Sequence, residues 1–215
     1  IGRKGETPVP PLNLVGDFGG GSMFLVMGIL AALYERERSG KGQVVDAAIV
    51  DGVASLMTMF SGLLPGGYIT LDPERNMLGG SAPFYRCYEC ADGKHISVGA
   101  LEPQFYAELL QRIGAPETLR SGQHVVDEWP ERRDTLAKLF KQKTRDEWCD
   151  ILEGTDACFA PVLTYEESLS HPHMQPRYVN VNGLQQAAPA PRLSRTPAEV
   201  QKSGDGAALL ARWKR

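Results

Sequence analysis

Residues 17–34, DFGGGSMFLVMGILAALY, place an acidic residue and three glycines directly before a long apolar run. The run is apolar on every side, which is typical of a helix that is buried on most of its surface. It ends in the charged stretch 35–38 and in Gly40, and glycine commonly stops a helix in the left-handed conformation. The pattern predicts a helix over about 22–38, with its N-terminus just after Asp17.

Two segments that follow suggest the architecture of this first region. Residues 43–47 have the composition of a short strand, and residues 48–63 form a second apolar helix pattern. A strand between two buried helices predicts an α/β layer whose other strands lie outside this chain. Residues 64–83 hold repeated prolines and glycines and are predicted to be a linker.

A different pattern begins at Phe84. Alternating segments at 85–90 and 95–100 flank Asp92-Gly93, which is a strong signal for a β-hairpin. A threonine followed three residues later by glutamate marks two helix starts, at Thr144 and Thr164. The other predicted elements are helices at 103–113, 130–141, 145–153 and 164–170, a strand at 157–163, a mostly irregular stretch at 171–206 and a short helix from 206. The sequence therefore predicts a compact α+β unit over 84–170.

The composition argues against several classes of protein. The 23 Lys+Arg residues against 26 Asp+Glu give a net charge of -3, which excludes the basic footprint of a nucleic-acid-binding protein. The longest apolar run, Met23–Tyr34, is shorter than the roughly 18 residues of a membrane span, so no membrane contact is expected. The cysteines are too sparse for a disulfide scaffold, so we expect a reducing, cytoplasmic compartment. Because the chain opens at Ile1 without methionine, we expect it to be part of a longer protein.

Asp17 is the strongest candidate for chemistry. Glycines let a backbone approach a ligand closely, and a helix N-terminus offers free N–H groups and partial positive charge. Asp17 therefore has two interpretations: an ordinary N-cap, or a carboxylate acting beside donors that stabilise developing negative charge. The glycine triplet lacks the lysine and the spacing of nucleotide-binding loops, so neither of those loops is predicted.

The cysteine and histidine patterns do not indicate a metal site. Cys87-x-x-Cys90 lacks the second cysteine pair that a zinc ribbon requires, and its position in a strand differs from that of a redox motif. Packing cysteines are therefore the favoured interpretation. No catalytic role is assigned to the histidines, which are His95, His124, His171 and His173.

Several stretches of the chain resemble one family. They are Leu12–Gly21, Glu35–Ala48, Gly79–Gly93, Gly99–Tyr106 and Pro189–Thr196. In this order and spacing they are similar to the α-methylacyl-CoA racemases, which belong to the family III CoA-transferase superfamily. The resemblance implies an α/β fold in which residues 1–63 are the tail of a Rossmann-like CoA-binding domain. Residues 64–83 are then a linker, 84–170 a small α+β domain, and 171–215 a return linker with a C-terminal helix.

The resemblance also implies an activity and a set of site residues. Asp17 corresponds to a catalytic acid/base, and Glu102 to a glutamate that assists a partner histidine, which would lie upstream of Ile1. Without the resemblance, Glu102 before Pro103 is most simply a favourable charge at a helix start. Gly19, Gly20, Gly21 and Tyr85 correspond to positions that contact the CoA thioester. No metal or redox cofactor is implied, because CoA enters as part of the acyl-CoA substrate, and the family forms an interlocked homodimer.

Three functions remain open from the sequence. The first is a racemase or epimerase that inverts the α-carbon of a 2-methyl-branched acyl-CoA, with a base on one face and an acid on the other. The second is a CoA-transferase in which Asp17 is the nucleophile. The third is a catalytically inactive fragment, because the partner histidine and most of the CoA-binding region lie outside the chain.

Overall fold

The computed structural model describes residues 2–200 and 206–213 as a mixed α/β protein with two small sheets. The chain separates into two compact units, Ile1–Val162 and Leu163–Arg215. The mixed α/β class expected from the sequence is confirmed, whereas the expected domain boundaries at 63, 83 and 170 stay predictions. Short 3₁₀ turns connect the larger elements at Pro73–Arg75, Met77–Gly79, Glu117–Leu119, Val126–Glu128 and Gln175–Arg177.

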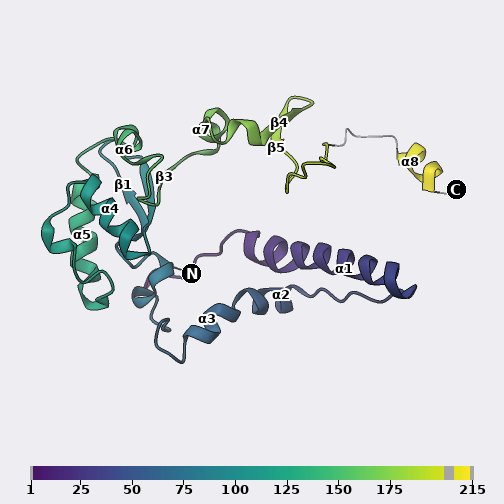
Figure 1. Ribbon diagram of the computed structural model, residues 1–215, viewed down its shortest axis with the longest axis horizontal. Coiled ribbons are helices and arrows are strands. Elements are labelled where there is room, and N and C mark those ends of the chain that lie inside the picture. Colours follow the sequence, from purple (N-terminus) through teal and green to yellow (C-terminus); the bar gives the residue numbers. More distant parts are fainter. Residues whose placement is uncertain (1, 201–205, 214–215) are drawn as a thin grey trace. The chain divides into compact units, whose positions relative to one another are not determined.

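The first long helix begins earlier than the sequence predicts. A π-helical segment, η1 (Leu14–Ser22), runs without a break into α1 (Met23–Ser39), which is the purple helix of Figure 1. Gly40 ends α1 at a φ of 71°, and its N–H donates to the Arg36 carbonyl at 2.8 Å. The helix at 22–38 is thus confirmed. Its N-terminus is not after Asp17, however, because Asp17 lies inside the π-helical segment.

The next predicted helix is two helices, α2 (Ile49–Leu56) and α3 (Thr58–Leu63), separated at Met57. Residues 41–48 connect α1 to α2 without regular secondary structure (Figure 1). The prediction of a strand at 43–47 is wrong for this chain. A strand requires a hydrogen-bonded neighbour, and neither sheet of the described residues includes this segment.

Glycines bring η1 and α2 into backbone contact. Gly20 and Gly21 are buried, and a Cβ on Gly20 would lie 2.8 Å from the Val53 nitrogen. A Cβ on Gly52 would lie only 1.8 Å from the Gly20 carbonyl oxygen. No side chain fits in either place, so the close approach that the glycine triplet permits is made to another helix.

Replacing Gly52 with alanine is predicted to break this contact. The added methyl group would overlap the Gly20 carbonyl, and such overpacking costs about 1–3 kcal/mol or more of the free energy of unfolding. Gly62→Ala is the matched control, because nothing lies within 4 Å of a Cβ there and alanine is favoured over glycine in a helix. Urea unfolding of both variants checks this, and equal stability would contradict the assigned contact.

The rest of α1 presents apolar side chains to the outside. None of its residues is buried, and Met27 and Leu30 are 58% and 61% exposed. The burial expected from its composition is therefore not provided by the described residues. Together η1 and α1 form a 26-residue helix that contains an 18-residue window with a mean hydropathy of 1.6, so it is long and apolar enough to cross a membrane by length and composition alone. The run-length argument against a membrane span therefore fails, although core helices of soluble proteins have the same properties.

A three-stranded antiparallel sheet organises the second half of unit 1. Its order is β1 (Tyr85–Glu89), β2 (His95–Gly99) and β3 (Phe159–Val162). The hairpin signal at Asp92-Gly93 is confirmed, because Gly93 takes a φ of 77° in the turn between β1 and β2. The predicted helices are also confirmed, as α4 (Pro103–Arg112), α5 (Trp129–Phe140) and α6 (Arg145–Leu152).

One face of the sheet packs against the helices. Tyr88 pairs with Ile96 across β1 and β2, and both side chains are buried. The Tyr88 ring stacks on Phe140 of α5 at 4.9 Å, and the Trp148 indole donates to the Phe140 carbonyl at 2.9 Å. Fully burying each such side chain contributes about 1.5–3 kcal/mol, so this face carries the main core of the described chain. Ser81 and Ala82, at the end of the predicted linker, and Phe84, directly after it, are also fully buried.

Capping boxes begin two helices, as the sequence predicts. The Thr144 side chain accepts from the Glu147 N–H, and Glu147 accepts from the Thr144 N–H at 2.8 Å. Thr164 and Glu167 repeat the arrangement at the start of α7 (Tyr165–Ser170). The hydrogen bonds from the Thr144 N–H and hydroxyl lower the pKa of Glu147 below its usual value.

This lowered pKa predicts an acid-sensitive contribution to stability. Because the folded state holds Glu147 at a lower pKa than the unfolded chain, the contribution is present above the unfolded pKa and disappears as the pH falls through the folded pKa. Glu147→Gln should therefore lose less stability than the wild type between pH 7 and pH 3, measured by urea unfolding. Glu199→Gln, at an exposed position outside the helices and strands, should retain the wild-type loss. Identical acid sensitivity in all three proteins would contradict the prediction.

Unit 2 contains a hairpin that the sequence analysis missed. After α7, strands β4 (Tyr178–Val181) and β5 (Leu184–Ala187) pair antiparallel, and the final helix is α8 (Gly206–Trp213). The stretch 171–206 is therefore not mostly irregular over 178–187. Asn182-Gly183 forms the turn with φ values of 54° and 85°, which is the strongest short hairpin signal. The predicted C-terminal helix is confirmed.

Candidate functional site

The second face of the three-stranded sheet is not covered by the helices of its own unit. Tyr85, Cys87, Ser97, Gly99 and Ala160 share this face, as the antiparallel register shows. They line a cavity of about 580 Å³ together with Gly79, Gly80 and Cys158. We call it the open-face cavity. The signal for it in the sequence is the alternation of residues along β1 and β2, which puts small residues opposite Tyr85.

Tyr85, the predicted contact for CoA, lies at the start of β1 on the wall of the open-face cavity. Its partner in the register is Gly99, and the Tyr85 ring lies close to that glycine, because a Cβ there would be 3.8 Å from Tyr85 Cε2. An aromatic ring beside small residues offers an apolar surface for a ligand. The structure therefore places Tyr85 at a cavity, and its contact with CoA stays a prediction.

Cys158 forms another wall of the open-face cavity and has an unusual backbone. Its φ is 50°, in the left-handed region that non-glycine residues rarely adopt, and its carbonyl accepts the Gly99 N–H at 2.8 Å. Burial raises the pKa of the Cys158 thiol, and the negative charges of Glu102 and Asp156 raise it further. Glu102 therefore lies close enough to this wall to act on it electrostatically.

Glu102 sits at the N-cap of α4, directly before Pro103. Its side chain is exposed and makes no capping hydrogen bond. Glu102 therefore stands at the start of a helix, as the simple interpretation requires, but its side chain does not hydrogen-bond to that helix. Within the residues that the structure describes, no ion pair or hydrogen bond holds the carboxylate, which leaves it available to a group outside this chain.

Asp17 is exposed on η1, outside the walls of the open-face cavity. Its carbonyl accepts from the Ser22 hydroxyl at 2.9 Å. The next N–H, that of Phe18, donates to the Asn13 carbonyl at 3.2 Å. The prediction of free N–H donors beside Asp17 is therefore wrong, because the helix has already begun at Leu14. No described contact brings Asp17 and Glu102 together, so their joint action stays a prediction.

Each glycine of the triplet lies against protein atoms in the direction that a Cβ would take. Gly20 and Gly21 face Ile49 and Val53 of α2, and a Cβ on Gly19 would lie 3.1 Å from the Leu14 carbonyl oxygen. These contacts provide a structural reason for all three glycines. Their predicted contact with the CoA thioester is not tested by this arrangement.

The two cysteines of Cys87-x-x-Cys90 have different environments. Cys90 is fully buried in the core, which confirms its packing role, whereas Cys87 is exposed on the open face, so the packing interpretation is wrong for Cys87. Burial raises the pKa of Cys90 and of Cys149 to about 11. Among the described residues no group of three or more His, Cys, Asp or Glu side chains could hold a metal ion.

These environments predict the order in which the thiols react. Iodoacetamide at pH 8 should alkylate Cys87 first and Cys90 last, because the reagent reaches Cys87 and because the Cys90 thiolate is both scarce and buried. Peptide mass spectrometry over a time course measures the order, with Cys87→Ser as the control that removes the fast site. Equal labelling of Cys87 and Cys90 in the folded protein would contradict the assignment.

The comparison with known proteins defines the class of protein. The model of CoA-transferase family III matches residues 1–204. The chain therefore belongs to CoA-transferase family III, as the resemblance in its sequence implied.

Particular relatives narrow this class. The α-methylacyl-CoA racemases of Mus musculus and Homo sapiens are 47% and 44% identical to the chain over 201 residues, which is 92% of this chain and 53% of each relative. A succinyl-CoA–D-citramalate CoA-transferase from Chloroflexus aurantiacus is 30% identical, over 84% of this chain and 48% of the relative. The chain thus spans about half the length of the curated relatives it matches.

Solved structures confirm the fold. A CAIB/BAIF family protein from Brucella suis matches with a TM-score of 0.72 and 19% identity, over 99% of this chain and 58% of that one. A hypothetical protein from Mycobacterium tuberculosis matches with a TM-score of 0.70 and 21% identity, over 92% of this chain and 53% of that one. The arrangement of the described helices and sheets is therefore that of family III CoA-transferase folds.

Proposed function

We propose that the protein containing this chain is a racemase or epimerase of 2-methyl-branched acyl-CoA thioesters. The observation that carries the proposal is the 44–47% identity to two α-methylacyl-CoA racemases over 92% of the chain. The CoA-transferase named above is only 30% identical, so the racemases are the nearer of these relatives. The acyl-CoA is the substrate, and no separate cofactor is proposed.

The proposed reaction moves one proton off the α-carbon and returns one to its opposite face. Asp17 is the acid/base on one side, and Glu102 positions the base on the other side, which the sequence resemblance places outside this chain. Both carboxylates are exposed and accept no described hydrogen bond, so neither is committed to a structural contact within the chain. The α-proton is acidic enough to remove only while the enolate oxygen is stabilised, and the donors for it must come from elsewhere than the N–H of Phe18.

Tyr85 and the open-face cavity are proposed to receive part of the acyl-CoA. The cavity has the volume of a small-ligand pocket and combines an aromatic ring with small residues. Glu102 acts electrostatically on Cys158 in its wall, which connects the proposed positioning residue to the cavity. Gly19, Gly20 and Gly21 keep η1 tight against α2, and the proposal needs them for the placement of Asp17.

A homodimer in the cytoplasm is part of the proposal. The exposed apolar side chains of α1 need a cover, and the chain spans about half of its relatives, so the remaining half or a second copy can supply it without a membrane. The four cysteines are free, which fits a reducing compartment. Neither a nucleic acid nor a membrane is a proposed partner.

Isotope exchange tests the acid/base role of Asp17. With one epimer of a 2-methylacyl-CoA in D₂O and no acceptor acid, the intact protein should introduce deuterium at the α-carbon. Asp17→Asn keeps the size of the side chain but removes the proton-transferring group, and should slow the exchange about 10²–10⁴-fold. Asp51→Asn, an exposed carboxylate on α2, should exchange at the wild-type rate. Mass spectrometry of the acyl-CoA measures the rate, and undiminished exchange in Asp17→Asn would remove Asp17 from the mechanism.

The second candidate is a CoA-transferase, favoured by the family model over residues 1–204 and by the 30% identical relative. There the Asp17 carboxylate attacks the thioester carbonyl and the CoA thiolate leaves, which gives a mixed anhydride. The thiolate then attacks the aspartyl carbonyl of the anhydride, the C–O bond breaks, the donor acid leaves as its carboxylate, and an aspartyl-CoA thioester remains. The same assay separates the two functions. Turnover that requires an acceptor carboxylate, without deuterium at the α-carbon, would support the transferase. Absence of both activities in the isolated chain, with activity in the intact protein, would support the third alternative, a catalytically inactive fragment.

A further inference from the structure

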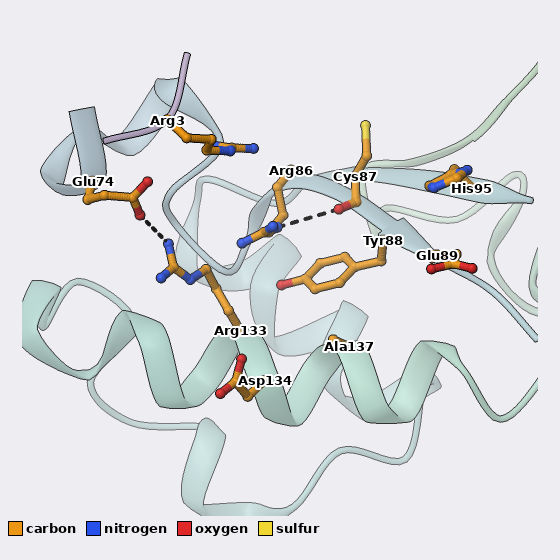
Figure 2. Close-up of a pocket in the computed structure, with 10 residues that line it drawn as sticks. All are labelled: Arg3, Glu74, Arg86, Cys87, Tyr88, Glu89, His95, Arg133, Asp134 and Ala137. Carbon is orange, nitrogen blue, oxygen red and sulfur yellow. Dashed lines mark hydrogen bonds and ion pairs between the residues drawn. The ribbon is translucent and has the colours of Figure 1, made fainter. Parts of the chain in front are cut away.

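Beside the open-face cavity lies a second cavity of about 570 Å³, bounded by the segment of Arg3, strand β1 and helix α5 (Figure 2). Three guanidinium groups line it: those of Arg3, Arg86 and Arg133. We call it the arginine cavity. Arg3 and Arg86 also line the open-face cavity, so the two spaces share a wall. Neither Asp17 nor Glu102 lines the arginine cavity.

Arg86 is held in place but is not neutralised. Its guanidinium lies over the Tyr88 ring at 5.3 Å, and its Nε donates to the Cys87 carbonyl at 3.4 Å (Figure 2). Tyr88 is itself fixed, because its hydroxyl donates to the Pro83 carbonyl at 2.6 Å. In the described part of the chain no carboxylate pairs with Arg86. Its two Nη groups are therefore oriented and available to an acceptor that the chain does not supply.

The charges around Arg86 are unbalanced. Arg133 pairs with Glu74 at 2.8 Å, and Arg3 donates to the Gly79 carbonyl at 3.1 Å. Burial lowers the pKa of Arg86, and repulsion by Arg133 and Arg3 lowers it further, whereas Tyr88 and the Glu74 carboxylate act in the opposite direction. The other lining carboxylates are Glu89, which pairs with Lys141 at 2.7 Å, and Asp134. Three guanidinium groups face the carboxylates of Glu74 and Asp134, and Glu89 is paired with Lys141, so about one positive charge, that of Arg86, is left without a paired carboxylate among the described residues.

We propose that the arginine cavity binds a phosphoryl dianion. The planar guanidinium fork matches the oxygens of a phosphoryl group, and guanidinium groups from three separate segments line this one space. A phosphoryl group carries about -1.5 to -2 charges at pH 7, so it supplies the negative charge that Arg86 lacks among the described residues. The group belongs either to free phosphate or to a phosphate of a CoA thioester that extends across the shared wall, and the chemistry of recognition is the same. The binding itself does not depend on the proposed racemase reaction.

Inorganic phosphate is the probe. The intact protein is titrated at constant ionic strength by calorimetry, in wild type, Arg86→Met and Arg120→Met. Methionine keeps much of the arginine stem but removes the charge. A charged hydrogen bond contributes enough that Arg86→Met should weaken phosphate binding at least about tenfold. Arg120→Met is the matched control, because Arg120 is exposed, pairs with Glu117 and lies outside the cavity, and it should bind phosphate as the wild type does.

If Arg86→Met fails to fold, the same phosphate titration is made with Arg3→Met. Arg3 lines the same cavity but is exposed, so its replacement should not disturb folding. Weakened binding in either cavity variant supports the proposal. The absence of saturable phosphate binding by the wild type, or unchanged binding in the folded variants, overturns it.

Competition assigns the source: displacement of phosphate by CoA but not by dephospho-CoA identifies the 3′-phosphate, and no displacement by CoA identifies free phosphate. An inactive enzyme that still binds phosphate would disprove the racemase proposal without affecting this one.

Discussion

The contact between Gly20 and Gly52 positions the segment that carries Asp17. Two backbones meet where no side chain fits, so η1 cannot slide or rotate against α2 without losing that fit. Interiors are packed too tightly to absorb a shift of this kind, and the position of the exposed Asp17 is therefore determined by a contact behind it. In this structure the contacts of the glycine triplet are with helix α2 and with η1 itself, so its observed role is the packing of the helices.

The two faces of the three-stranded sheet have different roles: one packs in the hydrophobic core, and the other lines a cavity. Alternation along β1 sends Tyr88 into the aromatic core with Phe140, while Tyr85 and Cys87 face the other way. The core face is filled, and the opposite face is free to line a cavity. A one-residue slip of the register would exchange the two sets of side chains, so the same pairing that stabilises the unit also sets the walls of the cavity.

Local signals predicted much of the fold. Asp92-Gly93 specified the first hairpin, and the spacing of Thr144 and Glu147 specified a helix start, because each pattern satisfies its own hydrogen bonds within a few residues. Asn182-Gly183 was an equally local signal that was overlooked. The predicted strand at 43–47 did not form, since pairing depends on a neighbour that is not in the described chain. The predicted helix N-terminus at Asp17 was wrong because a π-helical segment already begins at Leu14, before Asp17, which no short motif indicates.

The sequence by itself determined the helices, the first hairpin, the caps and the family, because these depend on hydrogen bonds and spacings between residues close in the chain. It also named Asp17, Glu102 and Tyr85, through resemblance. Only the tertiary structure decided that Tyr85 borders a cavity, that Cys87 and Cys90 have opposite environments, and that Arg3, Arg86 and Arg133 surround one space. Those outcomes depend on which face of a strand is covered and on segments far apart in the chain, and neither is encoded in any short stretch of residues.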